Sequence, residues 1–460
     1  MLSLRSVGQY RNFSTSSAAL AAAATRKSFN KKSSYDKSKN KKGSGNDKTF
    51  KASVLTKNYK KLALKADENL IKGLPSIVAE NKDTIKNSFV KYPSESIQKL
   101  HIAGSFKPDQ YNELYSQPLT LFRAVEDSKL LEIVHKNGSS AESRYIVNGD
   151  SGIGKSTILA HFQAFALAHN NNDAILFPIS NADLLVDGSS DFKLNQLTKK
   201  YDQPMYSRTF LKKFINLNAE SLAKVPLSAE ITPITNMYKA SSHKVSGTLL
   251  DLAKHILKAS PIESNTTFAF TTLLDELSKQ DKLPVYMTID NFSAFIQHGM
   301  SKYRDTENRR IYFQDFTIAD TLLQFVSGEK SFKNGAIMVA THGNHRLQRN
   351  GTLDVLAGDK PVEDFAYAKF RDFDYKLANR LLQNNGLQKF NVSKFNLDEC
   401  KSLVSHLLKF NLIHNEYDLE SQLLSGNLDT VIQRIASQKY LVSGNGIPKL
   451  VMDSCILSYA

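Results

Sequence analysis

The sequence lacks any long apolar run, since none of its hydrophobic stretches approaches 18 residues, the length at which a membrane-spanning helix is expected. It has two cysteines, Cys400 and Cys455, which lie far apart and do not have the spacing of metal ligands. Such cysteines suit a reducing compartment, and we expect both to be buried structural thiols. With 460 residues, 41% of them hydrophobic, the chain has the composition of a soluble globular protein of two or three domains.

Acidic residues are absent from residues 1–25, which contain Arg5 and Arg11 and are rich in serine and alanine. This composition is typical of a mitochondrial transit peptide. Arg11-Asn12-Phe13 before Ser14 resembles the cleavage pattern of the matrix peptidase, so we predict a transit peptide at 1–13 and import into the mitochondrial matrix. An ordinary disordered N-terminus is the alternative. A secretory signal fits less well, because its apolar stretch, Ala18–Ala24, is short and follows two arginines.

Positive charge is concentrated just after this segment. Residues 26–61 hold 13 lysines and arginines against two aspartates, and this stretch accounts for most of the net charge of +15. It has too few apolar side chains to offset the entropy cost of ordering, so residues 14–66 are predicted to form a disordered basic arm. Tyr35, Phe50 and Tyr59 lie among the lysines, a mixture that suits RNA phosphates and base stacking. A solvated linker is the alternative reading of the arm.

One stretch in the middle of the chain matches a phosphate-binding loop. Gly149 to Ser156 fits the pattern G-x-x-x-x-G-K-[ST]. The β-prone run Tyr145–Val147 precedes it, and a helical pattern with Ile158, Phe162 and Phe165 on one face follows it. The loop therefore has the strand before it and the helix after it that the motif requires.

The chemistry of phosphate binding explains this spacing. Glycines allow the backbone to bend around phosphate oxygens, and the start of the following helix adds partial positive charge. Lys155 can reach the β- and γ-phosphates of a nucleotide, and the Ser156 hydroxyl can bind Mg²⁺. The predicted nucleotide-binding residues are Gly149, Asp150, Ser151, Gly152, Ile153, Gly154, Lys155, Ser156 and Thr157.

A second nucleotide signature lies 135 residues after Lys155. Residues 284–290 form an apolar strand that ends in Asp290, whose carboxylate is expected to order Mg²⁺ through a coordinated water. Ser156 and Asp290 are thus the predicted metal site. Another buried strand, 336–341, ends in Thr341, which could sense the γ-phosphate or could simply end the strand.

The remaining segments are assigned by pattern. Residues 67–143 are predicted to be a mainly helical N-terminal extension, in which 118–123, followed by Leu130, Leu131 and Val134, form a helical segment. The nucleotide-binding domain is predicted at 144–395, with a second strand at 174–179, a last strand at 387–392 and an insertion at 180–280. The insertion has helical stretches at Leu249–Leu257 and Phe268–Leu277. Asn396 with Glu399 three residues on predicts a helix cap that opens a helical C-terminal domain, 396–460.

Strands alternating with helices after a phosphate loop predict an α/β fold: a P-loop NTPase of AAA+-like type, with a parallel sheet flanked by helices. One residue and one motif expected of such enzymes are missing. Asn291 follows Asp290 where AAA+ hydrolases place a water-activating glutamate, and no Asn-Lys-x-Asp guanine motif is present, so the base of the nucleotide is open. No residue is assigned a catalytic role, and at most slow nucleotide hydrolysis is expected.

At this point the chain resembles a known family, the mitochondrial small-ribosomal-subunit P-loop proteins of the death-associated protein three family, in a fungal form. The matching features are 118–123, Arg144-Tyr145 leading into Gly149–Thr157, and Val285–Asp290 without a following glutamate. The lysine-rich imported N-terminus and the helical tail also match, and the resemblance covers roughly residues 110–460.

The resemblance implies a structural protein of the mitochondrial ribosome, at the head of the small subunit near the subunit interface. It implies GTP or GDP as ligand, with ATP as a further possibility, bound with Mg²⁺. The implied partners are the small-subunit rRNA, neighbouring ribosomal proteins and the large subunit across the interface, with no membrane segment.

Two classes of function remain open. The first is a ribosomal structural protein that retains a nucleotide, and the second is a matrix AAA+-like ATPase or nucleotide-dependent signalling switch. Asn291 and the basic arm favour the first. A P-loop kinase is a distant third, because no constellation of a substrate-activating base is visible.

Overall fold

The computed structural model describes most of the chain after residue 69. The described residues are 70–78, 85–136, 138–241, 243–259, 265–296, 300–342, 351–356, 358, 374–410, 412–413 and 428–456. All of them belong to one compact unit, 56–460. The predicted transit peptide and basic arm lie outside the described residues and stay predictions.

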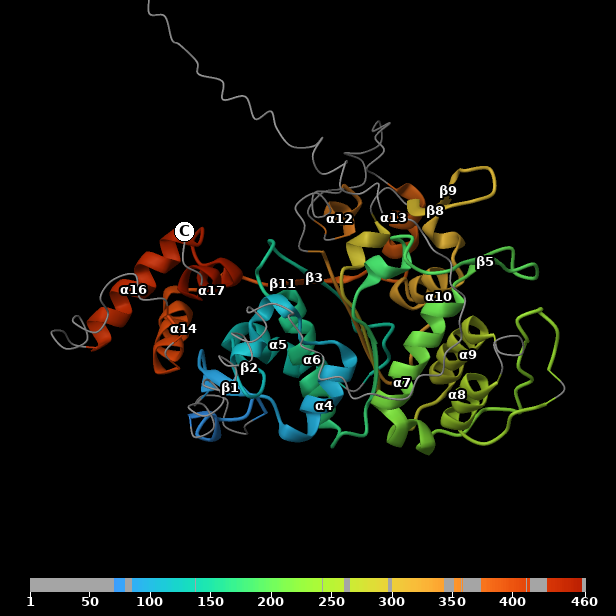
Figure 1. Ribbon diagram of the computed structural model, residues 1–460, viewed down its shortest axis with the longest axis horizontal. Helices are drawn as coiled ribbons and strands as arrows, with labels where there is room; N and C mark the ends of the chain where they lie inside the picture. The colour runs from blue at the N-terminus through green and yellow to red at the C-terminus, as the bar shows by residue number, and fades with distance from the viewer. Residues whose placement is uncertain are drawn as a thin grey trace, which may run out of the picture. The chain divides into compact units, whose positions relative to one another are not determined.

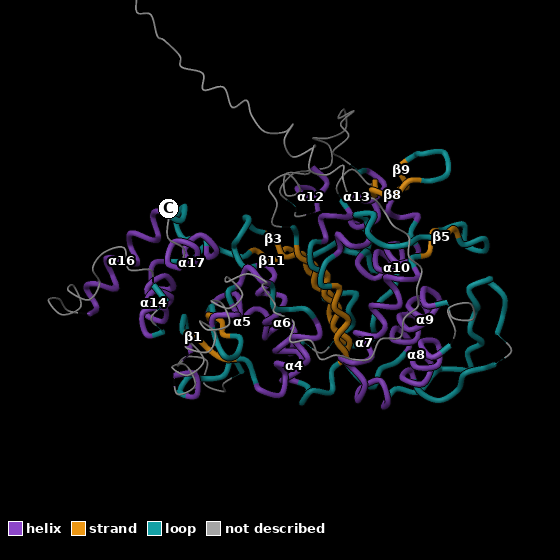
Figure 2. The backbone as a smooth tube through the Cα atoms, viewed as in Figure 1, coloured by secondary structure: helices purple, strands orange, loops and turns teal. Residues whose placement is uncertain are grey.

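A five-stranded parallel sheet forms the centre of this unit, as the sequence predicted (Figures 1 and 2). All four predicted strands of the nucleotide domain, and the predicted last strand, belong to it. In spatial order the strands are β11 (Gln388–Asn391), β3 (Arg144–Asn148), β10 (Gly335–Ala340), β7 (Val285–Ile289) and β4 (Ile175–Ile179). One strand, β10, therefore separates the strand before the phosphate loop from the strand before Asp290.

The inner strands are apolar nearly throughout because the sheet is covered on both faces. Successive side chains point to opposite faces, so Phe177 packs into one core and its neighbour Leu176 into the other. Pro178 is tolerated in β4 because this strand pairs with β7 alone among the described strands. The free edge of β4 is covered by Asn218, whose side-chain amide accepts from Leu176 N and donates to Leu176 O, both at 2.9 Å.

Helices cover both faces of the sheet (Figure 1). On one face lie α4 (Ser94–Ala103), α5 (Ala124–His135) and α6 (Lys155–His169). On the other lie α7 (Pro204–Lys224), α8 (Leu249–Lys258), α9 (Thr266–Lys279) and α10 (Thr317–Val326). The helical stretches predicted near 249–257 and 268–277 are confirmed as α8 and α9, and α7, which was not predicted, packs beside them on β4.

One prediction in the N-terminal extension is wrong. The apolar run at 118–123 was expected to be helical, but Leu119–Leu121 form β2, which pairs antiparallel with β1 (Phe89–Lys91). A run this short has no helical period of its own, so pairing with a strand about 30 residues earlier decides its conformation. Leu130, Leu131 and Val134 lie on α5 and are buried, as expected.

The described residues after 396 are mainly helical, as predicted. They form α14 (Leu397–Lys409), α16 (Leu428–Val442) and α17 (Pro448–Ile456). The predicted cap is present, since Asn396 Oδ1 accepts from Glu399 N at 2.7 Å and Glu399 Oε2 accepts from Asn396 N at 2.8 Å. Cys400 and Cys455 are buried in the core of this helical group, as expected.

Shorter elements connect these layers. They are the 3₁₀ turns η1 (Pro108–Gln110), η2 (Asn112–Leu114), η3 (Ala182–Leu185), η4 (Phe292–Phe295) and η5 (Phe313–Asp315), the strands β5 (Lys193–Leu194), β6 (Tyr201–Asp202), β8 (Met300–Arg304) and β9 (Arg310–Tyr312), and the helices α12 (Gly351–Leu356) and α13 (Tyr375–Leu382). Among the described helices, none combines the length and the apolar character needed to cross a bilayer.

Candidate functional site

The predicted phosphate loop connects the end of β3 to the start of α6, at the carboxyl edge of the sheet. Gly154 precedes the helix with φ 100°, a conformation that side chains disfavour. Gly152 has φ 76°, and a Cβ atom there would lie 2.8 Å from the Cβ atom of Lys449. Glycine is therefore required at position 152 both by the backbone conformation and by the close approach of α17.

Lys155 is the first residue of α6 and its side chain curls over the loop. Its ammonium donates to the carbonyl oxygens of Gly149 at 2.7 Å and of Asp150 at 2.9 Å. Burial lowers the pKa of Lys155 to about 8, although the carboxylates of Asp150 and Asp290 act in the opposite direction. The ammonium thus lies among the backbone groups of the loop that the motif assigns to phosphate binding.

Ser156 and Asp290, the predicted metal pair, are brought together by the fold. The Ser156 hydroxyl donates to Asp290 Oδ2 at 2.8 Å. Ser156 lies in the first turn of α6 and Asp290 directly follows β7, so the contact joins residues 134 positions apart. Parallel strands end at the same edge of the sheet, which explains how two motifs distant in sequence share one place.

The other predicted loop residues take different roles. Ile153 is buried in the core beneath the loop, and Ser151 is half-buried. Asp150 is exposed, with its carboxylate 3.9 Å from Lys394 Nζ. Thr157 Oγ1 accepts from Gln110 Nε2 at 3.3 Å, which fixes the N-terminal extension to the first turn of α6.

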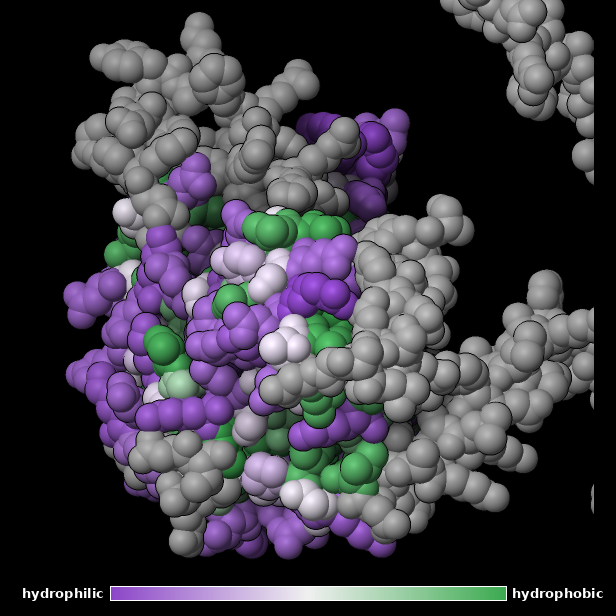
Figure 3. Space-filling model, turned by 90° about the vertical axis from the view of Figure 1, so that its left-hand side faces the viewer, coloured by the Kyte–Doolittle hydropathy of each residue, from purple (hydrophilic) through white to green (hydrophobic). Residues whose placement is uncertain are grey.

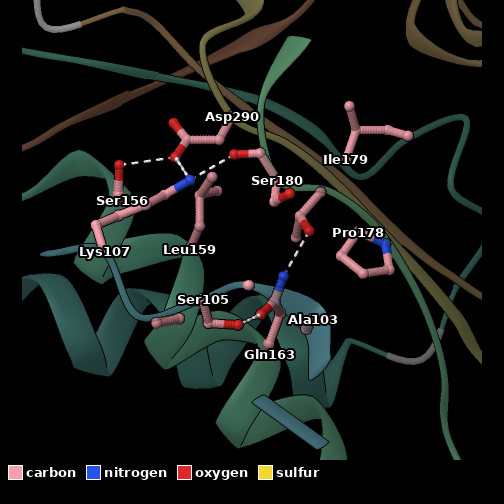
Figure 4. A pocket seen from close by; sticks show the side chains of 13 residues that line it. Ala103, Ser105, Lys107, Ser156, Leu159, Gln163, Pro178, Ile179, Ser180 and Asp290 are labelled. Atoms are coloured by element: carbon pink, nitrogen blue, oxygen red, sulfur yellow. Dashed lines mark hydrogen bonds and ion pairs between the residues drawn. The ribbon is translucent and has the colours of Figure 1, made fainter. Parts of the chain in front are cut away.

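A cleft opens beside Ser156 and Asp290 (Figure 4). Its lining comes from the end of α4 and the turn after it, from α6, and from the ends of β4 and β7: Ala103, Gly104, Ser105, Lys107, Ser156, Leu159, Ala160, Gln163, Pro178, Ile179, Ser180, Thr288 and Asp290. Lys107 and Ser180 were not predicted as site residues. Neither carries a local sequence signal, because each is brought to the site by the folding of distant segments.

Asn291, where a hydrolase would place a glutamate, lies in a left-handed conformation with φ 59°. Its side-chain amide donates to Asn181 Oδ1 at 2.9 Å and to Asp183 Oδ2 at 3.2 Å. His342 Nε2 is 3.3 Å from the same Asp183 oxygen. Asp183 was not predicted as a site residue, and its carboxylate lies directly beside position 291. Glu307, a carboxylate in the segment after Asp290 that could substitute for the missing glutamate, lies instead in the turn between β8 and β9 and pairs with Arg309 at 2.6 Å.

Thr341 directly follows β10, between the two nucleotide motifs. It is buried, and its hydroxyl and backbone N–H both point to Val147 O, at 3.3 and 3.1 Å. These bonds tie the end of β10 to the end of β3. Sensing of the γ-phosphate by Thr341 stays a prediction.

The C-terminal helices contact the loop directly. Lys449 N, in the first turn of α17, donates to Gly152 O at 3.0 Å. Further along the same helix, Asp453 accepts a hydrogen bond from the Tyr111 hydroxyl of the N-terminal extension. The loop is thus enclosed by its own domain, by α17 and by the extension, which together position its backbone.

Comparison with known proteins gives two matches. A family model described as mitochondrial ribosomal death-associated protein 3 matches residues 125–454. A small ribosomal subunit protein, mS29 of Schizosaccharomyces pombe, is 24% identical over 346 residues, which cover 73% of this chain and 68% of the relative. The family match includes the phosphate loop, Asp290 and most of the C-terminal helices.

Proposed function

The chain belongs to the mitochondrial ribosomal death-associated protein 3 family, and we propose that, as a structural component of the small subunit of the mitochondrial ribosome, it holds a purine nucleotide with Mg²⁺ and contacts ribosomal RNA. Family membership makes it a mitochondrial ribosomal protein, in agreement with the localisation expected from the sequence. The nucleotide, the metal and the RNA contacts are the parts that we propose.

The observation that carries the nucleotide proposal is the convergence of Lys155, Ser156 and Asp290. These are the charge, the hydroxyl and the carboxylate that a P-loop needs, and they lie in the segments that follow β3 and β7, two strands separated by β10. The positive-φ glycines of the loop and the start of α6 supply backbone N–H groups for phosphate oxygens. This arrangement supports a P-loop NTPase fold of AAA+-like type with GTP or GDP, or alternatively ATP, on Gly149–Thr157.

The residues present fit Mg²⁺ in the manner of P-loop sites. Ser156 Oγ and Asp290 Oδ2 are hard oxygen donors, which this cation prefers. Among the described residues, no group of three or more histidine, cysteine, aspartate or glutamate side chains could hold a metal ion by itself. Ser156 and Asp290 would therefore hold Mg²⁺ jointly with phosphate oxygens, and the ion would screen the phosphate charge.

Retention of the nucleotide, with slow turnover, is the mode of action that Asn291 favours. An amide can orient a water molecule but cannot accept its proton. The neighbouring carboxylate of Asp183 already accepts from the Asn291 amide and lies 3.3 Å from His342 Nε2, so we assign it no role as proton acceptor. The nucleotide then acts chiefly as a ligand that stabilises the folded domain.

The proposed partners are small-subunit rRNA, neighbouring ribosomal proteins and the large subunit across the interface. The basic arm at 14–66 supplies positive charge for RNA phosphates. The described surface on the side of the C-terminal helices is mostly hydrophilic, with hydrophobic side chains in separate groups (Figure 3). Such a surface suits polar partners such as RNA.

Sucrose-gradient sedimentation of a mitochondrial lysate tests the assignment to the small subunit. The chain is expected to migrate with the small subunit and, at Mg²⁺ concentrations that keep the subunits joined, with the whole ribosome. Sedimentation at the top of the gradient under both conditions would instead favour the matrix ATPase or signalling switch.

A further inference from the structure

Lys107 places an ammonium group on the carboxylate of the predicted metal site (Figure 4). Its Nζ atom is 3.1 Å from Asp290 Oδ2, the same oxygen that accepts from the Ser156 hydroxyl at 2.8 Å. The ammonium also donates to the carbonyl oxygen of Ser180. Lys107 thus makes its contacts at the oxygen that a divalent cation bound between Ser156 and Asp290 would use.

The backbone of this lysine is linked through Gln110 to α6. Its backbone N–H donates to Gln110 Oε1 at 3.1 Å, and Gln110 Nε2 donates to Thr157 Oγ1 at 3.3 Å. Thr157 directly follows Ser156 in the first turn of α6. The turn that carries Lys107 is therefore anchored to the helix that carries the phosphate-binding residues.

The local charge also matters. Among the described residues that line the cleft, Asp290 is the acidic one and Lys107 the basic one. Lys213, from α7, adds a second ammonium close by, with Nζ 3.2 Å from Ser180 Oγ. The Asp290 carboxylate is thus already neutralised by protein cations, and its side chain is only 6% exposed, which strengthens the interaction.

An ammonium has three N–H groups, and the two partners named above use two of them. The third can donate to a phosphate oxygen of a nucleotide bound on the loop. Since Lys155 contributes a further positive charge at the loop, the protein by itself offers several cations to the phosphates. Mg²⁺ would add to this charge and would have to share Asp290 with Lys107.

We propose that Lys107 acts on Asp290 in place of the divalent cation when Mg²⁺ is absent, so that the nucleotide also binds without the metal. This inference rests on the proposed nucleotide binding and adds to it a named residue outside the loop. A second possible role of Lys107 would be to anchor the N-terminal extension. Loss of such an anchor would weaken nucleotide binding equally with and without Mg²⁺, so the two roles can be distinguished.

Fluorescence titration of the full chain with N-methylanthraniloyl derivatives of GDP and ADP, in MgCl₂ and in EDTA, tests the proposal. For the wild type we expect dissociation constants in the two buffers to agree within about threefold. Lys107→Met should weaken binding about tenfold or more in EDTA, the loss expected for a charge-assisted hydrogen bond, and much less in MgCl₂. Lys107→Arg, which keeps the cation, should restore most of the binding in EDTA.

Lys394→Met is the matched control, since Lys394 lies near Asp150 at the loop and has no ion pair with Asp290 among the described residues. It should change binding by the same factor in both buffers. An unchanged ratio of the two dissociation constants in Lys107→Met would overturn the inference and leave the proposed function standing, and so would a wild type that needs Mg²⁺ for binding. A wild type that binds neither nucleotide in either buffer would refute the proposed function, and the inference with it.

Discussion

At the scale of single residues, Lys155 is the side chain on which the proposed nucleotide site depends most. Its ammonium donates to the loop carbonyls, and we propose that it pairs with a phosphate held by the loop's N–H groups. Lys155→Ala removes this charge without touching the sheet. We expect the affinity for nucleotide to fall about 10- to 100-fold, the usual loss for hydrogen bonds to a charged group.

Titration of the purified variant with a fluorescent nucleotide measures this loss. Lys224→Ala is the control, because Lys224 pairs with Asp173 at the surface and lies at the end of α7. Wild-type affinity in the Lys155→Ala variant would show that the loop does not hold the ligand.

A second prediction at this scale concerns His406, on α14. Its ring stacks on Phe89 with centroids 3.7 Å apart, and its Nε2 atom has no hydrogen-bond partner among the described residues. Burial, together with the charge of Lys409, lowers the pKa of His406 from 6.5 to about 3. Because the folded pKa is depressed, the folded protein keeps the ring neutral while the unfolded chain takes up a proton below pH 6.5.

The stability that depends on neutral His406 is therefore fully present above pH 6.5 and is lost as the pH falls from 6.5 towards 3. The slope is about 1.4 kcal/mol per pH unit for one proton. Thermal unfolding followed by circular dichroism at pH 7 and pH 5 should show a smaller decrease in His406→Phe than in the wild type. The exposed His243 provides the control, and an equal decrease in His406→Phe and His243→Gln would rule out this assignment.

At the scale of elements, a buried arginine joins three parts of the nucleotide domain. The side chain of Arg144, at the start of β3, is 1% exposed. It donates to the carbonyl oxygens of Ala141 at 3.0 Å and Val326 at 2.9 Å, and also to that of Asn384. Val326 ends α10, so the positive charge also lies at the negative end of that helix.

We predict that Arg144→Met destabilises the domain by about 2–4 kcal/mol, because it leaves buried carbonyl groups without their donors. Thermal unfolding by calorimetry should show a midpoint several degrees lower than that of the wild type. Arg310→Met, at an exposed position of β9, should leave the midpoint nearly unchanged. A midpoint equal to that of the wild type in Arg144→Met would mean that these contacts contribute little.

The elements also show how far the sequence could predict the fold. The strand before the loop, the loop and α6 were predictable because their signals lie within about 25 consecutive residues. The conformation of 118–123 was not, because it is decided by pairing with Phe89–Lys91. Helix α7 was missed, although Pro204 in its first turn was an available signal.

The residues of the candidate site were predictable only where they belong to a sequence motif. Lys155, Ser156 and Asp290 belong to motifs, and the fold brings them together as expected. Lys107 and Asp183 belong to no motif. Their positions depend on the course of the chain after α4 and after β4. Residues that act through tertiary contacts alone cannot be recognised from one sequence.

At the scale of the whole molecule, we expect both the basic arm and the folded unit to contact RNA phosphates. Each phosphate neutralised lowers the slope of log K against log salt by about 0.7–0.9. Deleting residues 26–61 removes 13 basic side chains, so we expect the slope for binding to small-subunit rRNA to flatten by several units. Filter binding between low and moderate salt measures it, and an unchanged slope would assign the RNA contacts to the folded part.

We propose that this mitochondrial ribosomal protein holds a nucleotide on its phosphate loop. The most direct measurement is the purine nucleotide content of purified mitochondrial small subunits, extracted with acid and quantified by chromatography, from cells with the wild-type chain and with Lys155→Ala. We predict about one purine nucleotide more per subunit in the wild type than in the variant, with both chains present in the subunit. Equal nucleotide contents in the two preparations would show that the loop does not hold a nucleotide in the ribosome.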